Sequence, residues 1–150
     1  RPASMAEAKL ADLIKQLAEA VAGRTGLKIA LSVPNDIHLP NDVNVTLYRI
    51  AQEALTNVVK HAKAENVKIY CSKDGNFAEG EQNTLTVSMV IEDDGCGFET
   101  KKIAQDHFGL YNMQERADSI DAVLEISSVP GAGTKIAVVW KGEEPTSNDE

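Results

Sequence analysis

Cysteine, basic residues and long apolar runs are scarce in this sequence, and each scarcity excludes a class of protein. The 150 residues include only Cys71 and Cys96, too few for a disulfide scaffold, and no Cys or His spacing predicts a zinc site. A reducing, cytoplasmic compartment is therefore expected. No apolar run approaches the roughly 20 residues that span a bilayer, and the polar start does not resemble a signal peptide. With 15 Lys and Arg against 23 Asp and Glu, the formal charge of −8 argues against a nucleic-acid partner.

The composition is that of one globular domain. Hydrophobic residues make up 43% and charged residues 25% of the chain, which is long enough for a core of its own. We expect this domain to span residues 1–141, with about 1–5 being a cloning remnant or the end of a linker. Residues 142–150 are polar and acidic, which predicts a disordered tail.

The hydrophobic pattern alternates between helical and strand periods. Helices are expected over residues 5–22, over a longer stretch to residue 62 with Asn41 or Asp42 as N-cap, and over 109–120. Strands are expected at 27–33, 66–72, 84–92, 122–129 and 134–140, with a long polar connection over 73–83. Hairpin-linked strands without crossover helices predict an α/β (α+β) two-layer sandwich, with helices on one face of a mixed, mostly antiparallel sheet.

The helix predicted to end at residue 62 has an apolar and a polar half when each residue advances by about 100°. The polar half carries Glu53, Asn57 and Lys60, with His61 at the border. A solvated helix face accounts for these residues. They also suit a magnesium–phosphate site, because Asn offers a neutral oxygen to a hard cation and Lys offers a charge to phosphate. The apolar half is expected to be buried and comprises Leu47, Ile50, Ala51, Ala54, Leu55, Val58, Val59 and Ala62.

The segment "IEDDGCGFE" ends a predicted strand in two carboxylates, Asp93 and Asp94, which are followed by Gly95 and Gly97. Three alternatives fit it: a β-turn, a metal loop, or one wall of a nucleotide pocket. It is not a Rossmann or Walker loop, nor an EF-hand, because the spacing that each of these requires is missing.

Two further glycine motifs follow. Gly109 stands where a helix is predicted to begin, which is either a plain helix start or an anion site at free N–H groups. Gly131, Gly133 and Thr134 precede a strand, and they form either a hairpin turn or a close approach of the backbone to a ligand. Each structural explanation is credible for its own motif, but four such motifs in this order favour one shared site.

In order, "RIAQEALTNVVKHA", "IEDDGCGF", "FGLYNMQERA" and "PGAGT" resemble the N box and glycine boxes of the GHKL ATPase superfamily. More narrowly, they resemble the ATP-binding catalytic domain of sensor histidine kinases of the nitrate/nitrite-sensor-like subfamily. The resemblance covers about residues 10–140. It implies a Bergerat-type sandwich that binds ATP with Mg²⁺.

The resemblance also implies roles for residues of the N box. Asn57 would bind the Mg²⁺ that bridges the ATP phosphates, and Glu53 would be the N-box carboxylate with a catalytic or water-orienting role. Lys60 and His61 would lie beside the phosphates.

The glycine boxes would form the base side of the site by the same resemblance. Asp93 would accept a hydrogen bond from the adenine amino group, and many family members carry Asn where this chain has Asp94, whose role stays open. Residues 98–108 would form a short ATP lid. The remaining implied nucleotide-binding residues are Gly95, Gly97, Gly109, Leu110, Gly131, Gly133 and Thr134.

A histidine kinase transfers the γ-phosphoryl group of ATP to a histidine on a separate dimerisation domain, and then to a response regulator. None of His38, His61 and His107 lies in a predicted acceptor helix, and the initial "RP" resembles the end of a connection from such a domain. The isolated domain is therefore expected to bind ATP as a monomer, and the parent protein to be cytoplasmic or membrane-anchored. Two alternatives share the fold: a non-catalytic nucleotide-binding module and a serine kinase of the anti-sigma-factor type.

Overall fold

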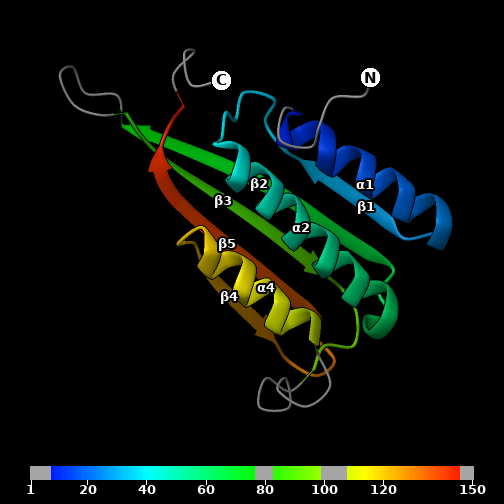
Figure 1. The fold of residues 1–150 in the computed structure, drawn as a ribbon. Coiled ribbons are helices and arrows are strands. Elements are labelled where there is room, and N and C mark those ends of the chain that lie inside the picture. Colours follow the sequence, from blue (N-terminus) through cyan, green and yellow to red (C-terminus); the bar gives the residue numbers. More distant parts are fainter. Residues whose placement is uncertain (1–7, 77–82, 99–107, 146–150) are drawn as a thin grey trace.

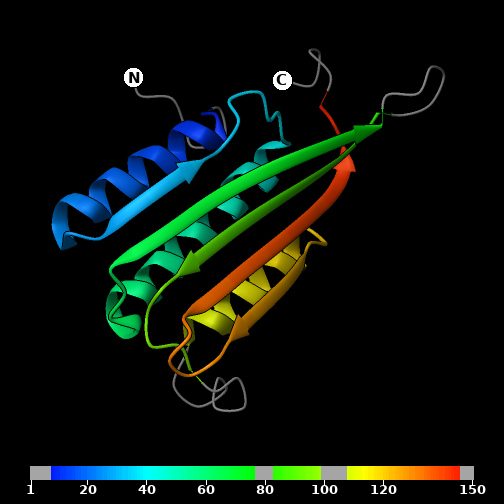
Figure 2. The same cartoon turned by 180° about the vertical axis from the view of Figure 1, so that it is seen from behind.

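Three helices cover one face of a five-stranded sheet (Figure 1) in the computed structural model, which describes residues 8–76, 83–98 and 108–145. The helices are α1 (Leu10–Thr25), α2 (Asn41–Asn57), which a π-helical turn η1 (Val58–Ala62) continues, and α4 (Phe108–Ser119). The strands are β1 (Lys28–Ser32), β2 (Asn66–Asn76), β3 (Thr84–Asp93), β4 (Val123–Ser128) and β5 (Thr134–Glu143). Seen from behind, the strands lie in front of the three described helices (Figure 2), so none of the described helices covers the second face of the sheet.

The strand order is β1-β2-β3-β5-β4. β1 runs parallel to β2, and every other neighbouring pair is antiparallel. The predicted two-layer α/β sandwich with a mixed, mostly antiparallel sheet is therefore confirmed. None of the described helices is both long and apolar enough to cross a membrane.

The core between the layers is built on a cross-strand row of isoleucines. Ile69, Ile91, Ile136 and Ile126 stand opposite one another on β2, β3, β5 and β4. Burying one such side chain contributes about 1.5–3 kcal/mol to the free energy of unfolding. From the helix layer, α2 adds a buried stripe that includes Leu47, Ile50, Ala51, Ala54 and Leu55, each fully shielded from solvent. Helix α2 thus packs against the sheet along its buried stripe, and this packing fixes the position of the carboxyl end of α2.

Some predicted boundaries were wrong. Pro40 holds the N-cap position of α2, and neither Asn41 nor Asp42 caps the helix, because the Asp42 carboxylate accepts a hydrogen bond from the neighbouring Val43 amide instead. Likewise α1 continues to Thr25, where Gly26 ends it with a left-handed φ of 77°. Residues 5–7 of the predicted first helix lie outside the described residues.

Two strands are longer than predicted. β2 pairs with β3 as far as residue 76, so the first part of the expected polar connection belongs to the ladder, and residues 77–82 are not described. β5 continues to Glu143, two residues into the segment expected to be a tail. Residues 144 and 145 follow it without regular structure, and residues 146–150 lie outside the described residues.

Val59 does not belong to the buried half of its helix, contrary to the prediction. Its side chain is 40% exposed, whereas Val58 and Ala62 are buried as expected. The difference arises because Val58–Ala62 is π-helical. A π-turn holds more residues than an α-turn and shifts the faces that follow it.

Candidate functional site

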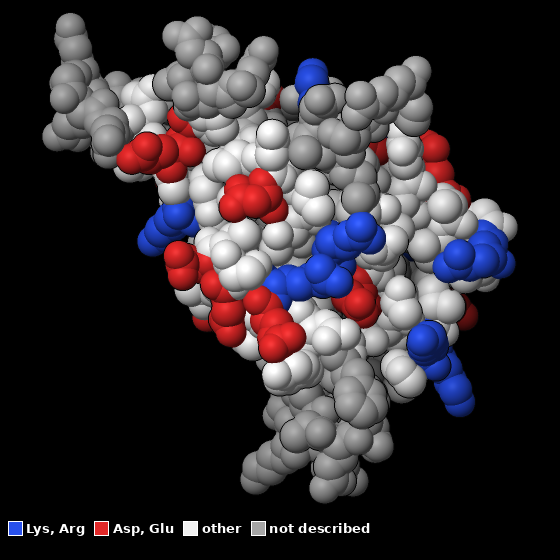
Figure 3. Space-filling model, in the orientation of Figure 1, with Lys and Arg blue, Asp and Glu red and all other residues white. Residues whose placement is uncertain are grey.

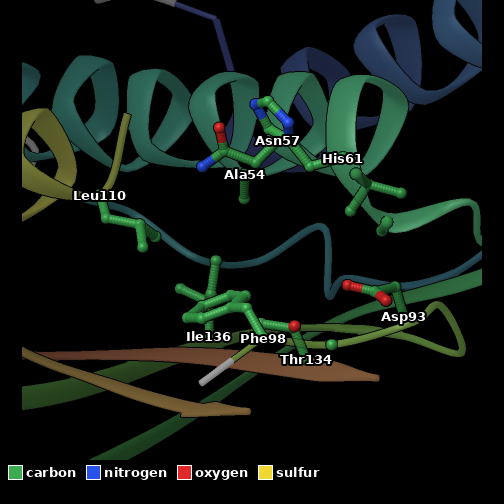
Figure 4. Close-up of a pocket in the computed structure, with 11 residues that line it drawn as sticks. Ala54, Asn57, His61, Asp93, Phe98, Leu110, Thr134 and Ile136 are labelled. Carbon is green, nitrogen blue, oxygen red and sulfur yellow. The ribbon is translucent and has the colours of Figure 1, made fainter. Parts of the chain in front are cut away.

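A cavity of about 270 Å³ opens between the carboxyl end of α2 with η1 and the strand ends opposite (Figure 4). Asn57 and His61 approach it from the helix side, and Asp93 and Thr134 from the strand side. Its other lining residues are Ala54, Val58, Ala62, Gly97, Phe98, Leu110 and Ile136. A concave, mostly apolar wall with a few convergent polar groups is typical of a small-molecule site.

Half of the predicted site residues line this cavity. They are Asn57, His61, Asp93, Gly97, Leu110 and Thr134. The others do not line it: Glu53, Lys60, Gly95, Gly109, Gly131 and Gly133. The expected lid falls largely on residues 99–107, which lie outside the described residues.

Apart from Leu110 and Phe98, sequence reasoning did not predict the apolar part of the wall as part of the site. Ala54, Val58 and Ala62 belong to the buried half of the helix and reach the cavity where that half passes the strand ends. Ile136 follows Thr134 by two residues and shares its side of β5. That period of two is a signal that could have identified it from the sequence.

The polar groups of the strand side form a row of their own. Asp93 on β3 stands opposite Thr134 on β5, and Thr134 stands opposite Ser128 on β4. Asp93 and Ser128 come two positions after an isoleucine of the core row, and Thr134 comes two positions before one. Successive residues alternate between faces, so the polar row lies on the same face as the isoleucines, at the end of the sheet.

Asp93 carries a carboxylate that is only partly exposed. Its Oδ1 accepts a hydrogen bond from the Gly95 amide at 2.8 Å. Burial raises the pKa of this carboxyl, and the hydrogen bond from Gly95 opposes the rise in part. A ligand that donates a hydrogen bond to this carboxylate would compensate its lost hydration.

Asp94 has a structural role, which the sequence left open. Its Oδ1 accepts hydrogen bonds from the backbone amides of Glu65 and Asn66, both at 2.9 Å, and its Oδ2 accepts one from Asn66 Nδ2 at 2.8 Å. These bonds hold the pKa of Asp94 below its usual value. The side chain thus ties the end of β3 to the start of β2 and is directed away from the cavity, which it does not line.

The loop after β3 is held at alternate residues. The Cys96 amide donates to the Ala62 carbonyl at 2.7 Å, and the Cys96 carbonyl accepts from the Gly131 amide at 2.6 Å. Two residues later, the Phe98 amide donates to Ser128 Oγ at 2.8 Å. The loop is therefore clamped between the end of η1 and the β4–β5 turn.

The glycines of this region make the clamp sterically feasible. A Cβ on Gly95 would collide with the backbone of Ala62, and one on Gly97 would collide with the Val129 carbonyl. A Cβ on Gly133 would collide with the Asp93 carbonyl. The sequence predicted close approach of the backbone to a ligand at these positions. The close neighbours in the structure are parts of the protein itself: Ala62 of η1, Val129 before the β4–β5 turn and Asp93 of β3.

Asn57 presents an unsatisfied polar group. Its Nδ2 is buried and has no hydrogen-bond partner among the described residues. A buried amide that lacks a partner costs about 1–3 kcal/mol, so this group is expected to find one in a ligand. Rotation of the amide exchanges its donor and acceptor ends, and an amide oxygen is a suitable ligand for a hard cation.

Charges are mixed on the helix-bearing face of the molecule. Lys and Arg side chains stand in separate groups among acidic ones (Figure 3). The described part of this face therefore offers no broad basic surface of the kind that nucleic acid requires. The described residues also contain no group of three His, Cys, Asp or Glu side chains able to hold a metal ion by themselves.

Comparison with known proteins agrees with this geometry. Residues 42–144 match the family described as histidine kinase-, DNA gyrase B-, and HSP90-like ATPase. An uncharacterised sensor-like histidine kinase of Chloroflexus aurantiacus is 32% identical over 124 residues, which cover 79% of this chain and 19% of that protein. The sensor protein VraS of Staphylococcus saprophyticus is 31% identical over 138 residues, which cover 92% of this chain and 37% of that protein.

The chain thus spans less than half the length of these curated relatives. Among solved structures, the histidine kinase domain of the blue-light-activated kinase EL346 from Erythrobacter litoralis has the same fold. It superposes with a TM-score of 0.69 at 18% identity, covering 88% of this chain and 60% of that one. The family match over residues 42–144 extends from the start of α2 to the end of β5, so it includes every residue that lines the cavity. The chain belongs to the family of histidine kinase-, DNA gyrase B- and HSP90-like ATPases.

Proposed function

We propose that this domain binds ATP with Mg²⁺ in the cavity and serves as the catalytic domain of a two-component sensor histidine kinase. The observation that carries the proposal is the arrangement of Asn57 on α2 opposite Asp93 on β3, across one apolar cavity. Asp93 would accept a hydrogen bond from the adenine amino group, and Asn57 would lie at the phosphate end of the nucleotide. The apolar wall between them covers the base and excludes water from it.

The phosphate end is proposed to use residues of α2 and η1. Asn57 would hold Mg²⁺ through its side-chain oxygen, with Lys60 and His61 beside the phosphates. Magnesium is usually bound by one or two protein groups together with substrate phosphates and water, so a single amide oxygen is adequate. When bound, the ion would neutralise phosphate charge. Glu53, one turn before Asn57, would orient the acceptor or accept its proton.

The base end is proposed to use the glycine loops. Gly95, Gly97 and Gly133 let the loops pack closely enough for Asp93 and Thr134 to face the base, and Gly131 supplies a left-handed φ of 83° in the β4–β5 turn. Gly109 and Leu110 would contact the nucleotide where α4 begins, since the first amides of a helix are free to bind anions.

In the full-length protein, the acceptor would be a histidine on a separate dimerisation domain, and a response regulator would take the phosphoryl group next. The domain itself would be a cytoplasmic monomer, whether or not the parent protein is membrane-anchored. The phrases "EALTNVVKHA" and "GLYNMQERA" support a nitrate/nitrite-sensor-like subfamily.

Phosphotransfer in trans tests this proposal. The domain is incubated with γ-labelled ATP, Mg²⁺ and the parent's dimerisation domain, with the acceptor histidine replaced in a control. The proposal predicts an acid-labile, alkali-stable phosphohistidine, and a Glu53→Gln variant that still binds ATP but transfers more slowly. ATP binding without transfer would favour a non-catalytic nucleotide-binding module. An acid-stable phosphoserine would favour the anti-sigma-type serine kinase.

A further inference from the structure

The hydroxyl of Ser128, at the end of β4, joins three segments around the cavity. We propose that Ser128 is a positioning residue of the nucleotide site, which orients the Thr134 hydroxyl and holds Phe98 in place on the base side. Neither the sequence motifs nor the cavity lining singles it out. The inference rests on the proposed ATP-binding function.

Ser128 Oγ is hydrogen-bonded on three sides. It accepts from the Phe98 amide at 2.8 Å, lies 2.8 Å from Thr134 Oγ1, and donates to the Gly133 carbonyl at 3.2 Å. Phe98 and Thr134 both line the cavity. One half-buried hydroxyl therefore fixes two lining residues relative to each other.

The position of its single proton determines what Thr134 offers to a ligand. A hydroxyl has one donor and two acceptor positions. When Ser128 donates to Gly133, Thr134 donates to Ser128 and presents only lone pairs to the cavity. When Ser128 donates to Thr134 instead, the Thr134 proton is free to meet an acceptor such as a ring nitrogen of a base. The pair can thus match either kind of partner without movement of heavy atoms.

The Phe98 contact positions the apolar side of the site. The amide of Phe98 would lose its described side-chain acceptor if Ser128 lacked its oxygen. The Phe98 side chain forms part of the cavity wall. If Phe98 were held less firmly, its side chain would pack less closely against a base, since packing attraction falls steeply with distance.

Ser127 provides a matched control. It precedes Ser128 on β4 but is exposed on the opposite face of the sheet. Its side chain takes no part in the hydrogen bonds that surround Ser128. A Ser127→Ala variant therefore makes the same chemical change on the same strand without touching the clamp.

The test measures nucleotide affinity by calorimetry for wild type, Ser128→Ala, Ser128→Thr and Ser127→Ala. Ser128→Ala should weaken the binding of ATP and of ADP by the same factor, about 5- to 10-fold. The loss of affinity should be equal with and without Mg²⁺, because Ser128 acts on the base side. Ser127→Ala should bind as wild type, and Ser128→Thr, which keeps the hydroxyl, should recover most of the affinity. When Thr134 is already replaced by Val, Ser128→Ala should reduce the nucleotide affinity by a smaller factor, because the Thr134 hydroxyl is no longer there to be oriented.

Several results would overturn the inference. Equal affinities for Ser128→Ala and Ser127→Ala would do so, and so would a loss confined to Mg²⁺-containing buffer. If Ser128→Ala is unfolded at the assay temperature, the affinity of Ser128→Cys is measured instead, since Cys has a similar volume but forms weaker hydrogen bonds. Wild type that binds neither ATP nor ADP would overturn the proposed function itself, a result that is distinct from an unaffected Ser128 variant.

Discussion

Gly109, at the start of α4, lies directly against the side-chain amide of Asn57 on α2. A Cβ built on Gly109 would stand 2.8 Å from Asn57 Oδ1 and 3.0 Å from Nδ2. The three atoms nearest to it all belong to the side chain of Asn57. The position of Asn57 therefore depends on the absence of a side chain at residue 109.

Gly109→Ala should separate binding from stability. The added methyl group would push the Asn57 amide aside, so we expect affinity for Mg²⁺·ATP to fall by about 10-fold or more, the equivalent of roughly 1.4 kcal/mol. The melting temperature should stay level or rise, because Ala is the better helix former by about 0.8–1 kcal/mol in a helix interior. Calorimetric titration and thermal melts measure the two effects.

Gly23→Ala is the control for that experiment. Gly23 lies within α1, where an added Cβ meets nothing within 4 Å. It should raise the free energy of unfolding by about 0.5–1 kcal/mol and leave ATP affinity unchanged. A Gly109→Ala variant with wild-type affinity for Mg²⁺·ATP would show that Asn57 is not held as described.

Gly131 and Gly133 form a matched pair in the β4–β5 turn. Their φ angles are 83° and 80°, but only at Gly133 would a Cβ collide with a neighbour, the Asp93 carbonyl. Gly131→Ala should cost about 1–2 kcal/mol of unfolding free energy from the left-handed backbone alone. Gly133→Ala should cost more, roughly 3 kcal/mol or above, because backbone must also shift. Chemical denaturation compares them, and equal costs would contradict the close approach.

Asp93 and Asp94 should respond to pH with opposite signs. Burial raises the pKa of Asp93 in the folded state above the ordinary value of about 3.9. Between these two pKa values, the folded state binds more protons than the unfolded state. The free energy of unfolding that Asp93 contributes is thus greatest at low pH and falls as pH rises through this window. For Asp94, whose hydrogen bonds lower its pKa, the contribution is present above the ordinary value and is lost as pH falls.

Asp93→Asn and Asp94→Asn test these signs against wild type. From pH 3 upward, the unfolding free energy of Asp93→Asn should rise relative to that of wild type, and that of Asp94→Asn should fall. Denaturant titrations at several pH values give both differences. Parallel pH trends for the two variants would mean that the adjacent carboxyls do not have the distinct surroundings described.

The two thiols should differ sharply in reactivity. Burial raises the pKa of Cys71 to about 12, so almost no thiolate forms at neutral pH, whereas Cys96 is exposed. A thiol reagent should modify one cysteine per folded chain and both in denaturant. Cys96→Ser should abolish the rapid phase, and Cys71→Ser should leave it intact. Two rapid phases in the folded protein would contradict the placement of Cys71 in the core.

Much of this architecture follows from local pattern. The alternation of Val, Ile and Leu placed the strands, and hairpin-linked order predicted a helix layer on one face. The pairing of Asn57 with Asp93 across a cavity was also foreseen, from motif order and family resemblance. The strands and the helix layer depend on periodicity and element order, which the chain states directly, whereas the roles of Asn57 and Asp93 came from the resemblance.

Other features depend on contacts that the sequence does not state. Val59 was misplaced because nothing in "VVKHA" distinguishes a π-turn from an α-turn. The resemblance assigned Asp93 to the base but left the role of Asp94 open, because the three donors that bind Asp94 come from the start of β2. Ser128 stands opposite Thr134 through the register of β4 and β5, which the sequence does not state.

The central claim is that Asp93 recognises the base of a nucleotide that Asn57 meets at its phosphate end. Calorimetric titration of ATP into wild type and Asp93→Asn, each with and without Mg²⁺, tests it most directly. We predict that wild type binds ATP and that Asp93→Asn binds it about 10- to 100-fold more weakly in both buffers, because a hydrogen bond to a charged group contributes about 1.5–3 kcal/mol. Equal affinity of the two proteins for ATP would contradict the account.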